Sequence, residues 1–459
     1  METETEITPA LVLTAYEKKK GPIDRFLSIF ADVRAGEGAG VLLLALNVFI
    51  LLGSYYLLKT VREALILSEK GAEVKSYSAA GQAVLLLLIV PAYGLLGSKV
   101  NRINLINWVT LFFILHLAIF YALGVSGRHV GVAFFLWVGI FNVLVVAQFW
   151  GFANDLYVQS QGKRLFPIVG VGASLGAWVG AIVASRIFAT FGPYTLMLFA
   201  SAGLLACTVL SRISHSRESS SSPQRELKAK APLSAKGGFK LVLTQRYLLL
   251  IAILTVLLNV SNTTGEYMFG RLVTEHAKQA IASGTANGMS LENLIALTYG
   301  KFFSWVNLLG LVFQLFLVSR IFRYLGIRGA LFILPILSLG IYSLIAVLPI
   351  LAVVRWGKTL ENSTDYSIQN TTRHALFLPT SREAKYKAQA AIETFFWRTG
   401  DVLQAGVVFA GTRLAFTVRT YAALNVVLVL AWLGVAWAIY SQHRKMVPDE
   451  NAEMEPAAA

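Results

Sequence analysis

About twelve long apolar stretches dominate this chain of 459 residues. A helix that crosses a membrane needs roughly 20 predominantly apolar residues. Hydrophobic residues make up 56% of the chain and charged residues only 14%, whereas charged residues make up roughly 25% of a soluble domain. The pattern therefore predicts an all-α polytopic membrane protein. We expect spans at about 40–60, 76–98, 104–124, 130–156, 165–190, 193–211, 247–271, 296–322, 327–347, 350–374, 388–415 and 420–441.

A basic, Ser-rich segment divides these stretches into two sets of six. Residues 212–246 carry eight Lys or Arg against two Glu, which is typical of a flexible cytoplasmic linker. The expected organisation is an N-terminal segment with a short amphipathic helix, a six-helix half, the linker, a second six-helix half and a tail, at 1–38, 39–211, 212–246, 247–441 and 442–459.

The charges of the other loops predict the orientation of the chain. If the linker is cytoplasmic, alternation places four further basic loops inside, near residues 99–102, 163–164, 320–328 and 382–387. Both termini are then cytoplasmic. Two six-helix halves joined by a cytoplasmic loop are the plan of the major facilitator fold, in which the substrate binds between the halves. The lipid bilayer is thus an expected partner.

Charged and polar side chains inside or beside the apolar stretches are the candidate functional residues. A charge at the centre of a bilayer costs about 2.5–3.5 kcal/mol or more, so such residues usually face a water-filled path or a partner. Arg and Lys also suit phosphate, through planar forks and point charges respectively. The candidates for substrate binding are Lys59, Arg62, Glu63, Asn154, Asp155, Glu266, Lys301, Lys358, Asp365, Arg373, Lys385, Arg398 and Asp401.

Several of these candidates have a second interpretation. Lys59, Arg62 and Glu63 end the first expected span, where long side chains also serve as interfacial anchors. Asn154 and Asp155 are also compatible with ordinary polarity at a helix end. Lys301 is compatible with a position in the solute pathway and with a position at the membrane interface.

The remaining composition excludes other classes of protein. A single cysteine, Cys207, allows neither a disulfide within the chain nor a cysteine metal site. The six histidines are scattered, no phosphate-binding loop of the Walker type is present, and we expect no cofactor, no metal and no enzymatic activity. The net charge of +15 falls in loops, as in membrane proteins, so nucleic acid is not an expected partner. Small residues at 172, 176, 180 and 184 predict a close helix–helix contact.

Three segments resemble one known family. They are YYLLKTVREALIL (55–67), FWGFANDLYVQSQGKRLFPIVGVGAS (149–174) and DYSIQNTTRHALFLPTSREAKYKAQAAIETFFWRTGD (365–401). They are similar to the ATP/ADP antiporter family of plastids and intracellular bacterial parasites. The third segment looks more like bacterial relatives outside the parasites. The resemblance implies a twelve-helix, facilitator-like exchanger of nucleotides.

The resemblance also assigns positions. Arg62 and Glu63 stand where the family has a Lys followed by an acid. Asp155 and Glu266 look like its acids in the fourth and seventh helices. At Asp365 the base of the family has become an acid, whereas Lys385 and the lysine two residues later are kept.

The leading hypothesis is therefore a transporter of an anionic nucleotide or a related phosphorylated solute, working by alternating access and exchange. The alternative is a facilitator-type transporter of another organic anion, proton-coupled through Glu266 or Asp155. A membrane scaffold or sensor without transport would need larger soluble domains than the short linker and tails of this chain. We expect a monomer in a bacterial inner membrane.

Overall fold

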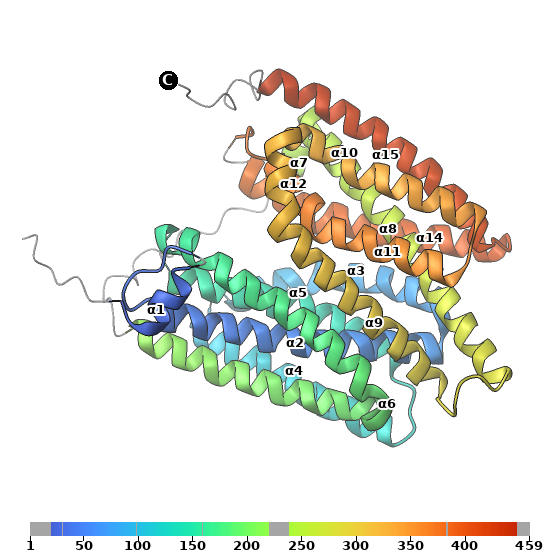
Figure 1. Cartoon of the computed structure of the whole chain (residues 1–459), viewed down its shortest axis with the longest axis horizontal. Helices are drawn as coiled ribbons and strands as arrows, with labels where there is room; N and C mark the ends of the chain where they lie inside the picture. The colour runs from blue at the N-terminus through green and yellow to red at the C-terminus, as the bar shows by residue number, and fades with distance from the viewer. Residues whose placement is uncertain are drawn as a thin grey trace, which may run out of the picture.

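A computed structural model describes residues 20–29, 31–97, 99–157, 159–219, 238–381 and 384–447. Within these ranges the chain is helical and contains no strand. The helices before the linker are α1 (Pro22–Leu27), α2 (Gly38–Glu69), α3 (Gly71–Gly97), α4 (Arg102–Val125), α5 (Gly131–Leu156) and α6 (Gln159–Ser219). Figure 1 shows them, in blue to green, gathered in one bundle, which we call the N-terminal half.

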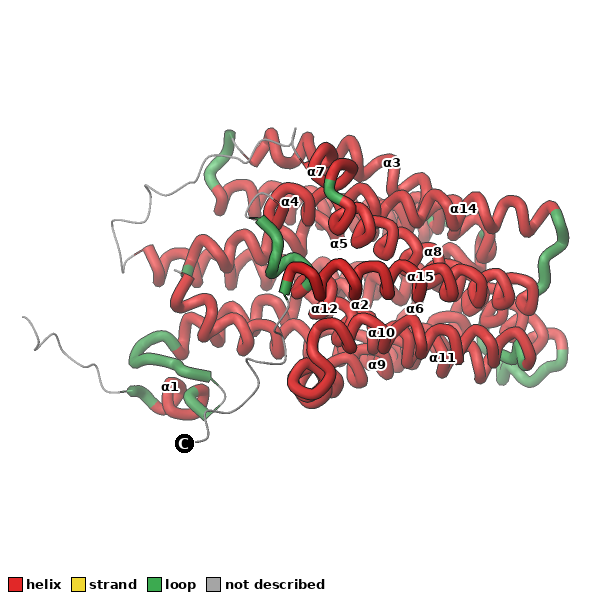
Figure 2. The backbone as a smooth tube through the Cα atoms, turned by 90° about the horizontal axis from the view of Figure 1, so that it is seen from above, coloured by secondary structure: helices red, strands yellow, loops and turns green. Residues whose placement is uncertain are grey.

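Part of the expected linker 212–246 is helical, because α6 continues to Ser219 and α7 begins at Gly238. The helices from residue 238 onward form a second bundle, the C-terminal half, in yellow-green to red (Figure 1). Its elements are α7 (Gly238–Thr244), α8 (Arg246–Ala282), α9 (Leu291–Val312), η4 (Phe313–Leu317), α10 (Val318–Val347), α11 (Leu351–Thr364), η5 (Asp365–Gln369), α12 (Asn370–Ala375), η6 (Ala384–Ala388), α13 (Gln389–Ala391), η7 (Ile392–Phe396), α14 (Trp397–Arg413) and α15 (Val418–Met446). The long helices of both halves run roughly along one direction (Figure 2).

Eight helical segments of the described chain are long and apolar enough to cross a membrane. Two of them are pairs of crossings, because α6 turns sharply at Gly192 and α10 at Gly326, where φ is 74° and 65°. Glycine adopts such angles without the steric cost that other residues meet. The sequence predicted breaks at both places.

Two more crossings are too polar to pass a hydropathy criterion. They are the tracts 351–375 and 384–413, which the sequence predicted from their length and spacing. Both contain π-turns, namely η5 in the first and η6 and η7 in the second. With the two kinked pairs, these tracts bring the architecture to about twelve crossings. Within the described residues, the prediction of an all-α polytopic membrane protein with about twelve crossings is confirmed.

Helix α2 is longer than the predicted span, which ended near residue 60. It continues to Glu69, and α3 begins at Gly71 instead of near residue 76. The extra turns carry Arg62, Glu63 and Lys75. These charges do not end the helices, because they pair with one another inside the protein instead of reaching for water.

The segment before α2 is a capped turn. The short helix expected in this segment is α1, which ends at Leu27 after six residues. The Asp24 carboxylate accepts hydrogen bonds from the backbone N–H groups of Gly36, Gly21 and Gly38, at 3.0, 2.9 and 2.8 Å. These bonds hold the pKa of Asp24 below its ordinary value, and the bond from Gly36 has the largest effect. Burial acts in the opposite direction.

Small residues bring α6 against α2, as the four-residue repeat predicted. A Cβ atom on Gly172 would lie 2.6 Å from the carbonyl oxygen of Ala45, and one on Gly180 would lie 2.5 Å from that of Gly53. Gly176 packs equally closely on Phe49. The halves then meet chiefly through α6 and α2 against α9, and through α3 against α14 and α8. This junction holds the cavity described next.

Candidate functional site

A polar cavity of about 210 Å³ lies where the two halves meet. Helices α2, α3 and α5 contribute one wall, and α8, α9, α11, η5 and α14 contribute the other. The residues around it are Lys59, Arg62, Glu63, Lys75, Ser76, Ala79, Phe135, Asn262, Thr263, Glu266, Tyr267, Phe303, Asn362, Tyr366 and Gln404. The position between the halves is the one at which this architecture holds its substrate.

Two of the three cations on the N-terminal wall pair with one buried carboxylate. Glu63 is 1% exposed, and Lys75 Nζ lies 2.6 Å from its Oε2 atom. The guanidinium of Arg62 pairs with Oε1 of the same carboxylate and stacks on the ring of Phe135, with 4.6 Å from Cζ to the ring centroid. The carboxylate therefore orders two cations at the cavity wall while neutralising only one of their charges.

Lys59 is the third cation, and its environment is aromatic. Its Nζ atom lies 4.4 Å from the ring centroid of Phe303 and 5.1 Å from that of Tyr56. Ring faces attract an ammonium group without using up its hydrogen-bond donors. Among the described residues no carboxylate lies within ion-pair distance of Lys59. Its donors thus remain available to an anion in the cavity.

The C-terminal wall presents acceptors and amides. Asn362 Nδ2 donates to Glu266 Oε1 at 2.8 Å, and Glu266 has no cation within ion-pair distance in the described part of the chain. Gln404 donates to Ser76 Oγ across the junction at 3.2 Å. Tyr366 is 46% exposed and belongs to the cavity wall. One wall is therefore cationic, and the other offers carboxylate, amide and phenol groups.

Lys358 and Glu361 form a closed pair beside the cavity. Lys358 Nζ lies 2.6 Å from Glu361 Oε2, and it also donates to the carbonyl and the side-chain oxygen of Asn262, at 3.1 and 2.5 Å. Tyr342 and Ser338 donate to the Glu361 carboxylate. An ammonium group has three donors, and all three are used here. The pair ties α11 to α8 and leaves no donor for a substrate.

Arg398 and Asp401 form another ion pair one helix away, on α14. Arg398 Nη1 lies 3.1 Å from Asp401 Oδ2, and Asn259 Nδ2 donates to Asp401 Oδ1 at 2.9 Å. Asn259 reaches this position because Gly400 has no side chain there: a Cβ atom would lie 2.7 Å from its amide nitrogen. The pair therefore joins α14 to α8 within the C-terminal half.

Comparison with known proteins agrees with this geometry. A family model described as TLC ATP/ADP transporter matches residues 16–125 and 133–443. The chain belongs to this family. The resemblance read from the three sequence segments is thereby confirmed. Because the family consists of transporters, the expectation that the chain is not an enzyme is confirmed as well.

Individual relatives are distant. The "ADP,ATP carrier protein 1" of Chlamydia muridarum is 24% identical over an alignment of 338 positions that covers 64% of this chain and 61% of the relative. The chain thus spans about six tenths of that carrier in the alignment. The protein of the same name from Rickettsia typhi is 20% identical over 494 residues and is aligned over 98% of its length, covering 94% of this chain.

Solved structures share the architecture. A nucleoside transporter, NupG, superposes with a TM-score of 0.61 at 12% identity and covers 88% of this chain and 99% of its own. A bacterial homologue of the iron transporter ferroportin in an inward-facing state gives 0.59 at 15% identity, over 86% and 98%. At such identities these structures show the fold alone.

Four of the predicted site residues of this TLC family member line the cavity: Lys59, Arg62, Glu63 and Glu266. The others lie elsewhere. Asn154 and Asp155 are exposed near the end of α5, and Lys301 is exposed on α9. Arg373 stacks over Trp397 at 4.7 Å, and Asp365 is buried in η5. Lys385 belongs to η6, and its side chain is outside the part described.

The sequence analysis missed Lys75, Gln404 and the aromatic partner Phe303. The expected second span begins at residue 76, so Lys75 falls just outside it. The signal was present in SEKGAEVKSYS, because this stretch has one glycine and no loop-forming run between the end of α2 and Lys75. Gln404 is one polar residue of the polar tract 384–413 and Phe303 is one apolar residue of α9, and only the packing of the two halves shows that they line the same cavity.

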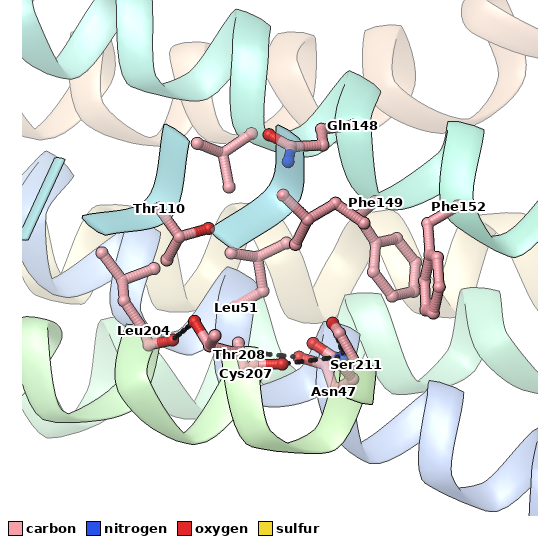
Figure 3. Close-up of a pocket in the computed structure, with 12 residues that line it drawn as sticks. Asn47, Leu51, Thr110, Gln148, Phe149, Phe152, Leu204, Cys207, Thr208 and Ser211 are labelled. Atoms are coloured by element: carbon pink, nitrogen blue, oxygen red, sulfur yellow. Dashed lines mark hydrogen bonds between the residues drawn. The ribbon is translucent and has the colours of Figure 1, made fainter. Parts of the chain in front are cut away.

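A second, much smaller cavity lies inside the N-terminal half (Figure 3). It has a volume of about 30 Å³, enough for roughly two waters at about 10–15 Å³ each. Asn47 donates to Ser211 Oγ at 2.9 Å at one side, and the amide atoms of Gln148, which is 3% exposed, have no hydrogen-bond partner among the described residues. The size suits ordered water and excludes a nucleotide.

Proposed function

We propose that this chain exchanges nucleotides of the ATP and ADP class across a membrane by alternating access of the central cavity. The observation that supports this most is Lys59, a cation in the cavity wall that is held by aromatic rings and pairs with no carboxylate among the described residues. Family membership and the carriers named above support nucleotides as the cargo. The nucleotide is cargo and is not hydrolysed.

The cationic wall suits the phosphate end of such a solute. Lys59 supplies unused donors, and Arg62 and Lys75 can exchange the Glu63 carboxylate for phosphate oxygens, which accept the same hydrogen bonds. Glu63 holds these two cations in place while the cavity is empty. The acceptors of Glu266 and Asn362 face the other end of the solute, where a nucleoside carries hydroxyl and amine donors.

The size of the cavity implies movement. Pockets for drug-sized ligands measure about 300–1,000 Å³, and the present 210 Å³ falls below that range. A nucleotide therefore requires the halves to separate further. Tyr267 on α8 donates to Glu73 on α3 at 3.0 Å, and Asn307 on α9 donates to the carbonyl of Ala177 on α6 at 3.5 Å. Such contacts between the halves would break and reform in each cycle.

For the cellular setting we propose a bacterial inner membrane, cytoplasmic termini and a monomer. The basic loops near residues 99–102, 163–164 and 320–328 support the orientation through the positive-inside rule. The substrate path lies inside one chain, between its two halves, so a single copy suffices to form it.

Transport by purified protein in liposomes tests the proposal. Liposomes are loaded with ADP or left empty, and uptake of labelled ATP, ADP and other nucleotides is measured. We expect ADP inside to accelerate uptake of external nucleotide. Equal uptake with and without internal nucleotide would contradict exchange. Uptake of another organic anion driven by a pH gradient would favour the proton-coupled alternative, for which Glu266 is the available carboxylate in the cavity.

A further inference from the structure

A row of buried polar side chains follows the polar tract 351–375 behind the cavity wall. Asp365 is 3% exposed, and its Oδ1 atom has no hydrogen-bond partner in the described structure. One turn later, Gln369 is fully buried, and neither atom of its amide has a partner. Buried polar atoms are almost always hydrogen-bonded, so two adjacent exceptions require an explanation.

No ion pair accounts for Asp365. Lys358 and Arg373 on its own tract, with Glu361, are the charged groups that act on it electrostatically. Lys358 and Glu361 form an ion pair with each other. Arg373 stacks on Trp397 and donates a hydrogen bond to Asn370 Oδ1 at 3.4 Å.

The elements packed against η5 offer no counter-charge either. The packed π-turn η4 (FQLFL) contains no titratable residue. From α10, the titratable Tyr342 is bound to Glu361. The arginines of α10 are engaged or exposed: Arg320 donates to the carbonyl of Phe316, Arg328 contacts His443, and Arg323 is exposed. On α9, Lys301 is exposed and Tyr299 lies against Phe269 and Lys75. Within the residues described, Asp365 is therefore a buried carboxyl group without a counter-ion.

A buried carboxylate without a counter-ion is costly, and such a group generally takes up a proton instead. A protonated carboxyl group has an O–H donor, and Gln369 Oε1 is a buried acceptor one turn away. The ionised Asp365 carboxylate would instead accept a hydrogen bond from Gln369 Nε2, once the side-chain amide of Gln369 has rotated to exchange its oxygen and nitrogen. The Asp365 and Gln369 side chains thus carry complementary hydrogen-bonding groups in either protonation state, and in this structure no hydrogen bond joins them.

We propose that Asp365 is a proton-binding site separate from the substrate cavity, protonated in this conformation, and that it releases its proton to water when the C-terminal half rearranges during transport. The second part rests on the proposed exchange function. Only a proton moves: the carboxyl O–H bond breaks, water accepts the proton, and the carboxylate remains.

Two features connect this site to the transport movement. Asp365 begins a π-turn, and conversion of a π-turn to α-helix rotates the residues on one side of it relative to those on the other. In addition, Lys358 on the same tract binds Asn262, which lines the cavity. A shift of α8 around a nucleotide therefore pulls on the tract that carries Asp365.

Infrared spectroscopy of the purified full chain tests the protonated state without any transport. We expect the C=O band of a protonated carboxylic acid at neutral pH. The band should be lost in Asp365→Asn and kept in the matched control Glu393→Gln, which removes an exposed carboxylate from the next tract. A band that is unchanged in Asp365→Asn would overturn the proposal.

If Asp365→Asn does not fold, isotope labelling keeps the test intact. Wild-type protein with carbon-13 in the aspartate carboxyl groups should shift the same band, because an aspartate carries the proton. Absence of any shifted protonated band at neutral pH would overturn the proposal.

Proton release is then measured with a pH indicator in weakly buffered solution. Addition of ADP should release protons from wild type and from Glu393→Gln but not from Asp365→Asn. Equal release from Asp365→Asn would overturn the link to the cycle. Failure of nucleotide exchange in liposomes would contradict the proposed function while leaving the infrared result on Asp365 untouched.

Discussion

At the scale of the residue, Lys358 shows how a charge inside the membrane is made tolerable. Its side chain has no exposed surface, and oxygens of Asn262 and Glu361 accept from its ammonium group. Removing one member of such a pair leaves the other charge buried and uncompensated. The pair is thus a condition for the fold of the C-terminal half.

We expect Lys358→Met to destabilise the protein by about 3–5 kcal/mol, the usual cost of breaking a buried ion pair. Thermal unfolding in detergent should show a clearly lower Tm. The control is Lys301→Met, which removes an exposed lysine and should change stability by no more than about 0.5 kcal/mol. Equal losses in both variants would contradict the role given to the pair.

The sequence could identify the charged residues that lie in or beside apolar stretches. It could not show which of them are paired and which line the cavity. Lys59 and Lys358 look alike in the sequence, since each is a lysine in or beside an apolar stretch. Their difference comes from partners far away in the chain: Asn262 lies on α8, whereas the lysine of the cavity meets the ring of Phe303 on α9. Pairing is a property of the packed helices, and single-sequence spacing does not contain it.

At the scale of the element, the contact between α2 and α6 depends on glycines. The backbone of α6 approaches so closely that Gly176 has no room for a Cβ atom beside Phe49. In a membrane, close backbone contact is a main source of helix association, because lipid is as apolar as the side chains.

Gly176→Leu should therefore separate α6 from α2, with a loss of stability at or above the about 1–3 kcal/mol typical of overpacking. Gly170→Leu on the same helix is the control, because a Cβ atom there meets no atom within 4 Å. Yield of folded protein and Tm measure both. A Gly176→Leu protein as stable as the control would contradict the packing described.

Element boundaries were predictable where local chemistry sets them. Glycine with positive φ ends a helix at Gly192 and Gly326, and both breaks were visible in the sequence. The continuation of α2 from residue 60 to Glu69 could not be predicted from the sequence. Charged residues such as Arg62 normally mark the end of a span, and here they stay in the helix because Glu63 and Lys75 neutralise each other within the bundle.

At the scale of the whole molecule, the close contact of α6 with α9 joins the two halves. A Cβ atom on Gly300 would lie 2.5 Å from the Cβ atom of Ser185. Alternating access requires this contact to open, because it joins elements of opposite halves.

A disulfide across this contact should stop transport reversibly. The variant combines Ser185→Cys and Gly300→Cys with Cys207→Ser, which removes the natural thiol. Cβ atoms in disulfides lie about 3.8 Å apart, a small displacement from the present contact. The new side chain at position 300 requires α6 and α9 to shift slightly, so each variant is compared with its own rate under reducing conditions. We expect an oxidant to block exchange by the double-cysteine variant and a reductant to restore it, while the single-cysteine variants do not respond to the oxidant. Full exchange by the cross-linked protein would contradict the movement.

The overall architecture was predictable because hydropathy and loop charge depend only on the order of residues along the chain. The two halves, the kinks and the family all follow from such local or ordered patterns. The closeness of the halves and the exact wall of the cavity do not, since Lys75, Gln404 and Phe303 become neighbours only when the halves meet.

The central claim is that the cations of the cavity hold the nucleotide phosphates, and Lys59 tests it most directly. The measurement compares the rate of ADP-stimulated ATP uptake for Lys59→Gln and for the exposed control Lys301→Gln in liposomes. A charge-assisted hydrogen bond contributes about 1.5–3 kcal/mol, and each 1.4 kcal/mol is about tenfold. We expect Lys59→Gln to lose about tenfold or more of its exchange at low nucleotide concentration while Lys301→Gln retains the wild-type rate. Wild-type exchange by folded Lys59→Gln would contradict the assignment of the cavity as the phosphate site.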